Sequence, residues 1–533
     1  MPGVALGDTK DTQAFQEHVM ARLQLPPPAP APALLFSDSA GARDWIAGQP
    51  LVTPEQMVDL LGQIRAVDAD ASLALGERFL ILAVLRSAVI RAQSGLEARY
   101  THKALPPGSD AAQSFALSRD LWRALSIAHL RMVPGLPPNK AVVPLHRAAV
   151  TLRLEHFAHV LARHDIPTAL NRLLYDVLTS AEEFSVLRSP VSDPDFDYLG
   201  ESVLAGHVAW AWLLAAVDPY GLSLAQLTVA NRAFSRWKDL AGFQGMQDDD
   251  PKARIIALHS LLPGVPLAEG GPRWIETRAV VRKIRRRVEA LEGGESPESL
   301  KLGRDLTTPA CIDLLRRLDL GLKRSGSGGF PESRPVTLAF GPENVYVALE
   351  RRPLNPVGLD AGSSAKNHER MAIFGFDNVA NLNGAVSRAQ VTGETWQLAG
   401  DRVVRLPGGA SRHQPPCLVA LAADNPAAVQ IGVLHSLKLT EDGCLSGAIR
   451  WYPEQALAAR LRRAGPMAAK APRVSAFVLP DEASGTFSLI LPPTAGVRSD
   501  SAIALDDSPV EHVRVGEVLE RGSDFVRYAC QTN

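Results

Sequence analysis

The chain has 533 residues, of which 46% are apolar and 21% are charged, and its 56 Lys and Arg balance 57 Asp and Glu. This composition excludes wholesale disorder, which requires low hydrophobicity and a high net charge. The formal net charge of -1 also argues against a chain that mainly neutralises nucleic-acid phosphates, so we expect no nucleic-acid partner. The four cysteines form no CxxC pair, which disfavours a disulfide framework or structural zinc and favours a cytoplasmic location.

Residues 1–35 are expected to form a flexible tail. Charged and amide residues interrupt its start, so it lacks the apolar core of a signal peptide. The run PPPAPAPA at 26–33 cannot form a helical hydrogen-bond ladder and favours extended geometry. We therefore predict that the run is a semi-rigid linker.

Residues 36–322 have the pattern of an all-α domain. Apolar residues recur at spacings of three and four, as in the stripe from Met57 to Val67, which places them on one helix face. Breakers such as Pro106-Pro107-Gly108 and Asp218-Pro219-Tyr220-Gly221 separate the stripes. Consecutive helices with short connections indicate helical hairpins, and such a half offers a surface for a protein partner.

The most apolar stretch of the chain is VLAGHVAWAWLLAAV, which ends at Val217. It is shorter than the roughly 20 residues that a membrane-spanning helix needs, and it contains His207. We expect a buried core helix and no membrane insertion.

A basic amphipathic helix is expected near residues 273–291. Trp274, Val281 and Val288 lie seven residues apart and predict its apolar seam. The arginines at four-residue spacing are Arg278, Arg282 and Arg286. Their face suits an anionic ligand, or it is a solvated surface paired with nearby glutamates; the second interpretation is favoured.

After Leu322 the pattern becomes strand-like. The flexible link SGSGG at 325–329 is followed by short β-branched and apolar runs separated by turn residues, which are typical of antiparallel barrels or sandwiches. The runs include VTLAF, VYVAL, CLVALA, VSAFVL and SLILP. A second boundary is expected in RAGPMAAKAP at 463–472, giving modules at 323–470 and 471–533. The predicted class is therefore α+β multidomain, with a helical-hairpin half before two small β-barrel modules.

The sequence supplies no recognised catalytic signature. GxSxG, HExxH and P-loop motifs are absent from it, and a metal site at His156 and His159 is disfavoured. Asp193, Asp195 and Asp197 alternate in SDPDFD, where a helix-capping loop is favoured over calcium ligation because the EF-hand glycine and closing glutamate are missing. We predict that the chain is not an enzyme and has no metal.

Three stretches carry a resemblance to a known family. They are DPYGLSLAQL with Arg232 and Trp237 downstream, the segment VRKIRRRVEALEGGESPESLKLGRDLTTPACIDLLRRL at 281–318, and the tail from ETWQLAGDRVVRL to VGEVLERGSDFVRY. The order and residue patterns of these stretches cover most of residues 110–530. In both respects the chain resembles long proteobacterial proteins with a PilZ-type barrel behind a helical half. The resemblance implies PilZ-like barrels and cyclic di-GMP as the ligand.

PilZ domains bind cyclic di-GMP through an arginine arm, RxxxR, and a strand motif, [DN]xSxxG. Arginine guanidiniums satisfy phosphates and guanine edges bidentately. Counted from Trp396, the strand-motif positions are Gly400, Arg402 and Arg405, so two cations stand where the family has Ser and Gly. Those cations either contact a phosphate or fill the site, and filling is favoured.

The resemblance predicts a non-enzymatic cytoplasmic signalling effector or adaptor of PilZ type. It is either cyclic di-GMP-responsive or a degenerate version that no longer binds; the alternative is a ligand-free helical scaffold that binds a partner protein. The candidate anion- or nucleotide-binding residues are Arg402, Arg405, Arg278, Arg282 and Arg286.

Overall fold

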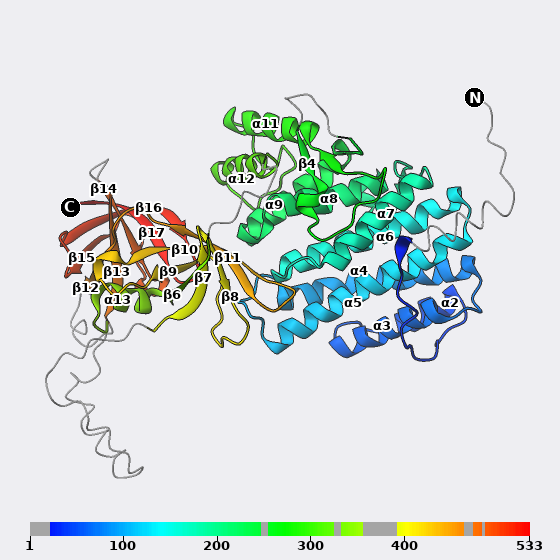
Figure 1. The fold of residues 1–533 in the computed structure, drawn as a ribbon, viewed down its shortest axis with the longest axis horizontal. Helices are drawn as coiled ribbons and strands as arrows, with labels where there is room; N and C mark the ends of the chain where they lie inside the picture. The colour runs from blue at the N-terminus through cyan, green and yellow to red at the C-terminus, as the bar shows by residue number, and fades with distance from the viewer. Residues whose placement is uncertain are drawn as a thin grey trace, which may run out of the picture. The chain divides into compact units, whose positions relative to one another are not determined.

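The computed structural model describes residues 22–246, 254–323, 332–354, 392–462, 473–481 and 486–532. It divides into two compact units (Figure 1). The first is Met1–Gly329 with Lys438–Asp442, and the second is Phe330–Leu437 with Gly443–Asn533. The predicted α+β class is confirmed, because a helical half precedes two closed six-stranded antiparallel barrels. The expected links at 325–329 and 463–472 lie outside the described residues.

Long helices form most of the first unit, and consecutive ones such as α4, α5 and α6 pack side by side (Figure 1). Their bounds are α2 Ser39–Ala47, α3 Pro54–Ala69, α4 Leu75–Tyr100, α5 Ser109–Met132, α6 Pro138–Ala162, α7 Thr168–Glu183, α8 Leu204–Ala216, α9 Leu224–Trp237, α10 Leu258–Leu261, α11 Arg278–Glu292 and α12 Thr308–Gly321.

Helix α3 shows how the sequence sets these elements. Thr53 and Gln56 form a reciprocal capping box, and Pro54 occupies the first turn, where its missing N–H is not needed. The predicted apolar stripe is buried, with Leu60 and Ile64 fully inaccessible. The local cap and the tertiary core therefore specify the same helix.

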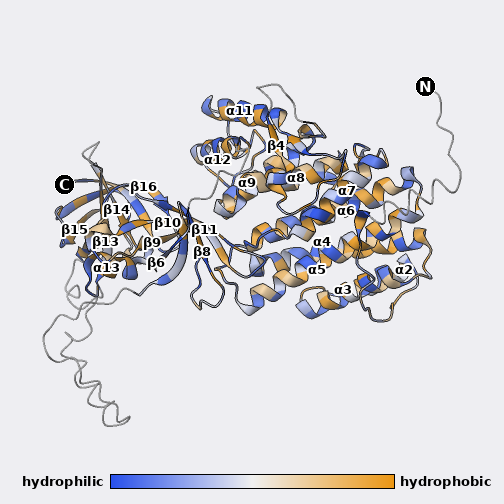
Figure 2. Cartoon of the chain, viewed as in Figure 1, coloured by the Kyte–Doolittle hydropathy of each residue, from blue (hydrophilic) through white to orange (hydrophobic). Residues whose placement is uncertain are grey.

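The apolar stretch ending at Val217 forms α8, which Figure 2 colours by hydropathy with the rest of the chain. Its residues from Leu204 to Leu214 are all buried, as expected. A different helix, α4, is long and apolar enough to cross a membrane by length and composition. In the structure, Ile81, Leu85 and Val89 of α4 are fully buried in the core of the helical unit.

The helical unit is not all-α, which corrects that part of the prediction. It contains a two-stranded sheet, β1 Val191–Ser192 with β2 Glu201–Ser202. It also contains a three-stranded sheet in the order β3-β5-β4, with bounds Gly242–Gln244, Trp274–Glu276 and Ile255–Ala257. Trp274 thus lies in a strand before α11 begins at Arg278, so its seven-residue spacing from Val281 did not mark a helix.

The expected flexible tail is attached to the helical unit over its described part, residues 22–35. Leu23 is buried, and the carbonyl of Pro26 accepts a hydrogen bond from Arg131 at 2.9 Å. The side chain of Gln63 on α3 donates to the Ala33 carbonyl and accepts from the Leu35 amide. These bonds hold the Pro-Ala run against α3.

The first barrel has the strand order β10-β11-β8-β7-β6-β9 and closes on itself. Its strands are β6 Arg334–Phe340, β7 Glu394–Ala399, β8 Arg402–Arg405, β9 Cys417–Leu421, β10 Gln430–Leu439 and β11 Leu445–Trp451. The run VYVAL was expected to be a strand, which is wrong. It forms helix α13, Pro342–Glu350, because Gly341-Pro342 starts a helix and Arg351 ends it in the left-handed conformation.

The second barrel has the order β12-β13-β14-β17-β16-β15. Its strands are β12 Leu457–Arg462, β13 Val474–Asp481, β14 Thr486–Leu491, β15 Ala502–Asp506, β16 His512–Arg521 and β17 Val526–Thr532. Because β12 pairs with β13 and β15, the second barrel begins before the expected boundary at 470/471.

Residues of both barrels contribute to one buried hydrophobic cluster in the second unit, and the second barrel also has a cluster of its own. Tyr346 of α13, Leu418 of β9 and Phe477 of β13 belong to a single buried cluster. Helix α13 contacts strands of both barrels, β6 and β9 on one side and β12 and β13 on the other. The two barrels therefore pack together through α13 and do not form two separate domains.

Candidate functional site

The two arginines at the strand-motif positions lie on β8 of the first barrel. Gly400 makes the turn from β7 into β8 with a φ of +67°, a conformation that glycine adopts without strain. Arg402 and Arg405 are three residues apart, so they face opposite sides of the strand. Arg402 is exposed, whereas Arg405 is buried. The structure therefore does not bring them together as one clamp.

Arg405 is bound from several sides. Its Nη1 donates to Glu394 at 2.6 Å, and its Nη2 donates to the carbonyls of Ser411 at 3.0 Å and Gly409 at 3.4 Å. The His413 Nε2 lies 3.4 Å from Nη1. Only the Nε of Arg405 is buried without a hydrogen-bond partner. Glu394 neutralises the cation, and the two carbonyls tie it to the segment after β8.

Glu394 is the centre of this cluster. Burial alone raises its pKa, but hydrogen bonds from His413, Arg405 and Ser411 outweigh burial and lower the pKa to about 2. His413 lies 3.1 Å from the Glu394 carboxylate and stacks against Phe340, with ring centroids 4.0 Å apart. The carboxylate is therefore held ionised at neutral pH.

A cavity of about 460 Å³ lies beside the cluster, lined by residues of β7, β8 and the segment that follows. A Cβ at Gly409 would lie 2.9 Å from the Arg405 Cζ, so a larger residue there would require the guanidinium to move. The guanidinium is also 5.6 Å from the centre of the Trp396 ring. The cavity wall is thus polar, but the charge of Arg405 in it is already neutralised by Glu394.

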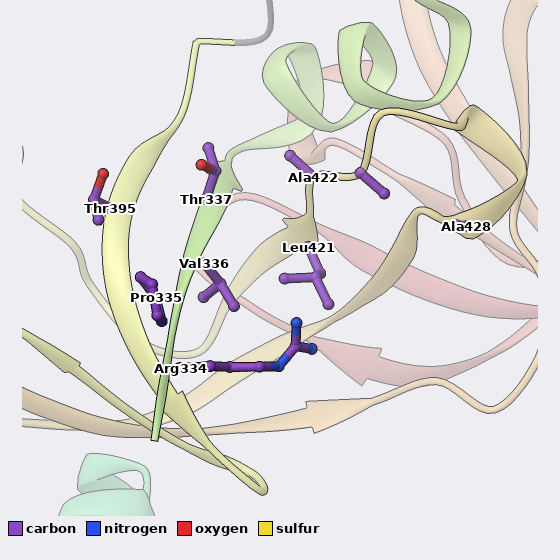
Figure 3. Close-up of a pocket in the computed structure, with 9 residues that line it drawn as sticks. Arg334, Pro335, Val336, Thr337, Thr395, Leu421, Ala422 and Ala428 are labelled. Carbon is purple, nitrogen blue, oxygen red and sulfur yellow. The ribbon is translucent and has the colours of Figure 1, made fainter. Parts of the chain in front are cut away.

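A second cavity of the first barrel, about 430 Å³, is shown in Figure 3. Arg334 of β6 reaches across it toward Leu421, and the other lining side chains, such as Val336, Thr337 and Thr395, are uncharged. One exposed cation in a mostly apolar wall is a weak match to a ligand with two phosphates.

The remaining predicted arginines lie on α11, in the other unit. Arg282 and Arg286 are exposed, and Arg278 is partly buried and lies 3.7 Å from Glu276. Among the described residues no ion pair is formed by Arg282 or Arg286, whereas Arg285 pairs with Asp319 at 3.6 Å. The face is therefore basic and accessible.

The SDPDFD segment caps a helix and also neutralises a buried cation. Asp193 caps the short helix η2, Pro194–Leu199, by accepting from the Asp195 amide. Both carboxylates bind Arg86 of α4, at 2.6–2.9 Å for Asp193 and 2.6 Å for Asp195. Arg86 is fully buried. This partner could not be predicted from a local motif, because 107 residues separate Arg86 from Asp193.

The two histidines considered for a metal are buried in α6. Burial lowers the pKa of His156 to about 3, and it lowers that of His159 well below its ordinary value. Within the described ranges, no group of three or more His, Cys, Asp or Glu side chains is placed to hold a metal ion. Sequence reasoning also missed Glu394 and His413, which have no recognisable motif.

One comparison with known proteins identifies part of the chain. Residues 40–249 match the family model described as the N-terminal domain of the cyclic-di-GMP receptor FimW. No curated protein and no solved structure matches the chain. The match lies within the helical unit, and it confirms the resemblance to cyclic-di-GMP receptors inferred from the sequence. Residues 40–249 are therefore similar to the N-terminal domain of the cyclic-di-GMP receptor FimW.

Proposed function

We propose that the chain is a cyclic di-GMP-responsive signalling effector without catalytic activity, acting in the cytoplasm. The observation that carries this proposal is the match of residues 40–249 to a cyclic-di-GMP receptor domain. The four cysteines, all of which the structure describes, are buried and form no disulfide, in keeping with a reducing compartment.

Within the first barrel, Arg405 acts as a structural residue. Four of its five N–H groups face Glu394, His413 and two carbonyls. A phosphate that bound the guanidinium would have to displace Glu394 and leave that carboxylate without its charge partner. Arg402 is exposed on the other face of β8, where a ligand can reach it.

The exposed cations of α11 suit the protein partner. Arg282 and Arg286 present two charges one helical turn apart, and the helix lies in the unit that carries the receptor-family match. An acidic surface on the partner would complement this face and speed association. Arg278 contributes less, because Glu276 lies beside it.

Isothermal titration of the full chain with cyclic di-GMP tests the proposal. We expect saturable binding with a micromolar or tighter dissociation constant. The absence of heat at millimolar nucleotide, supported by an unchanged Tm, would contradict it and favour the ligand-free scaffold. The loss of affinity in Arg402→Ala measures how much cyclic di-GMP binding depends on the exposed face of β8. Arg334→Ala, which alters the cavity of Figure 3, is the matched control.

A further inference from the structure

The outer face of the second barrel includes alternate residues of β14, β17 and β16, which are consecutive in its strand order (Figure 1). Successive residues of a strand face opposite sides. Tyr528 and Cys530 of β17 are buried in the core of this barrel. The residues that alternate with them, Arg527, Ala529 and Gln531, therefore face outward.

Small residues occupy the middle of this outer face. Ser488 of β14 lies opposite Ala529. On the other side of β17, the pairing with β16 shifts its register between Val515 and Val518, and such a bulge redirects side chains and often lies beside a functional site. Gly516 lies within the bulge, where a Cβ would come 3.0 Å from the Ala529 carbonyl oxygen. The strands therefore leave room above the sheet at this point.

A cavity of about 540 Å³ lies on this face, and Arg514, Arg527 and Glu454 are among the residues that line it. Arg514 of β16 is opposite Gln531, which is four residues, or about 13 Å of backbone, along β17 from Arg527. The two arginines are thus separated along one cavity, where they can contact different groups of a single ligand.

Arg527 is held in place but keeps unused donors. Its Nε donates to the Ser488 hydroxyl at 2.8 Å, and its Cζ lies 4.6 Å from the centre of the Tyr452 ring. The Tyr452 hydroxyl donates to Glu520 at 3.0 Å, which fixes that ring. Within the part of the chain that the structure describes, neither Nη atom of Arg527 makes a hydrogen bond. The outer edge of the guanidinium is therefore available to a ligand.

Glu454, between β11 and β12, lies next to this edge. Its Oε1 is 3.9 Å from the Arg527 Nη2, which is longer than the roughly 2.7–2.9 Å of a charge-assisted hydrogen bond. Its Oε2 is buried and has no hydrogen-bond partner among the described residues, although buried polar atoms are normally hydrogen-bonded. The cavity thus places donors and acceptors side by side without satisfying them.

The other charges of the cavity disfavour a simple phosphate site. Three carboxylates, those of Glu454, Asp500 and Glu517, line it together with the two arginines, so a bare anion would be repelled. Asp500 and Glu517 are exposed, and carboxylates of this kind accept hydrogen bonds from ribose hydroxyls. The set suits a ligand that combines a hydrogen-bonding edge, a sugar and one anionic group.

We propose that this cavity binds a guanine nucleotide. Guanine offers two acceptors, O6 and N7, to the Arg527 guanidinium, and its N1–H and N2–H groups can donate to the Glu454 carboxylate. Adenine has N7 next to an amino group on the corresponding edge, so it would satisfy Arg527 only in part. Arg514 is exposed, and its guanidinium suits the phosphate.

This inference does not rest on the proposed function. The receptor-family match covers residues 40–249, which belong to the first unit, whereas the cavity lies in the second unit. The site is therefore an additional one, and its ligand is recognised through the guanine base and one phosphate.

Isothermal titration of the full chain with GMP, guanosine and AMP tests the inference. We expect saturable binding of GMP and at least tenfold weaker binding of AMP. Glu454→Gln puts an amide where guanine presents its donors, so the affinity for GMP should fall at least tenfold at an unchanged Tm. Glu511→Gln changes an exposed carboxylate of the same barrel that does not line the cavity. It is the matched control and should bind GMP normally.

Arg514→Met separates the contribution of the phosphate from that of the base. The residue is exposed, so the variant should fold normally. Its affinity for GMP should fall about tenfold, the usual effect of losing a hydrogen bond to a charged group. Guanosine, which lacks the phosphate, should bind this variant and the wild type equally. An equal loss for GMP and guanosine would overturn the assignment of the phosphate to Arg514.

The remaining outcomes decide the site itself. Equal affinities for GMP and AMP, a Glu454→Gln affinity within twofold of the wild type, or no heat at millimolar GMP would each overturn the inference. A parallel titration with cyclic di-GMP separates it from the proposed function. If cyclic di-GMP binds the wild type and Glu454→Gln alike while GMP gives no heat, this inference fails alone. If GMP binds through Glu454 and cyclic di-GMP gives no heat, the proposed function fails alone.

Discussion

Replacing Glu394 with Gln should destabilise the first barrel by about 3 kcal/mol at neutral pH. The pKa of Glu394 falls from its ordinary value of 4.5 to about 2, and each pKa unit corresponds to about 1.4 kcal/mol. Hydrogen bonds to the charged form from His413, Arg405 and Ser411 are the source of this stabilisation. The glutamine amide would also leave the buried Arg405 without its counter-charge.

Hydrogen–deuterium exchange of the β7 and β8 amides is the appropriate assay. The chain contains more than one compact unit, so a single unfolding free energy does not isolate this barrel. A loss of 3 kcal/mol in local stability corresponds to roughly 100-fold faster exchange. Glu511→Gln, which changes an exposed carboxylate of the second barrel, should leave these rates unchanged.

The pH dependence has a defined sign. Because folding lowers the pKa of Glu394, its stabilisation is fully present above pH 4.5 and disappears as the pH falls toward 2. The exchange ratio between Glu394→Gln and wild type should therefore shrink over that interval. Equal rates within threefold at pH 7, or a ratio that stays constant down to pH 2, would refute the reasoning.

Two further substitutions test the packing around the arginines. Arg86→Met leaves the carboxylates of Asp193 and Asp195 without their cation, and it should cost about 3–5 kcal/mol of helical-unit stability, measured by hydrogen–deuterium exchange of the α4 amides; a loss below 1 kcal/mol would mean that water already satisfies them. Gly409→Ala places a Cβ 2.9 Å from the Arg405 Cζ and should cost about 1–3 kcal/mol, measured by exchange of β8. An unchanged β8 would show that the guanidinium can move aside.

Periodicity and turn chemistry predicted the order of the two halves. The stripe of α3 and the apolar α8 are buried as expected, because the same residues serve the local helix and the core. The errors fall where the local pattern was ambiguous. VYVAL has high β propensity, yet Pro342 starts a helix there and burial in the shared core outweighs that propensity.

The candidate site was less predictable, because charge partners are set by tertiary distance. The spacing of Arg402 and Arg405 suggested a common role, but their opposite faces on β8 separate them. Neither the pairing of Arg405 with Glu394 nor that of Arg86 with Asp193 follows from a local motif.

Hydrogen–deuterium exchange of the full chain with and without saturating cyclic di-GMP tests the central claim most directly. We predict slower exchange within residues 40–249, the segment that matches the cyclic-di-GMP receptor domain. Protection confined to residues 394–413 of the first barrel, or no protection anywhere, would contradict the account.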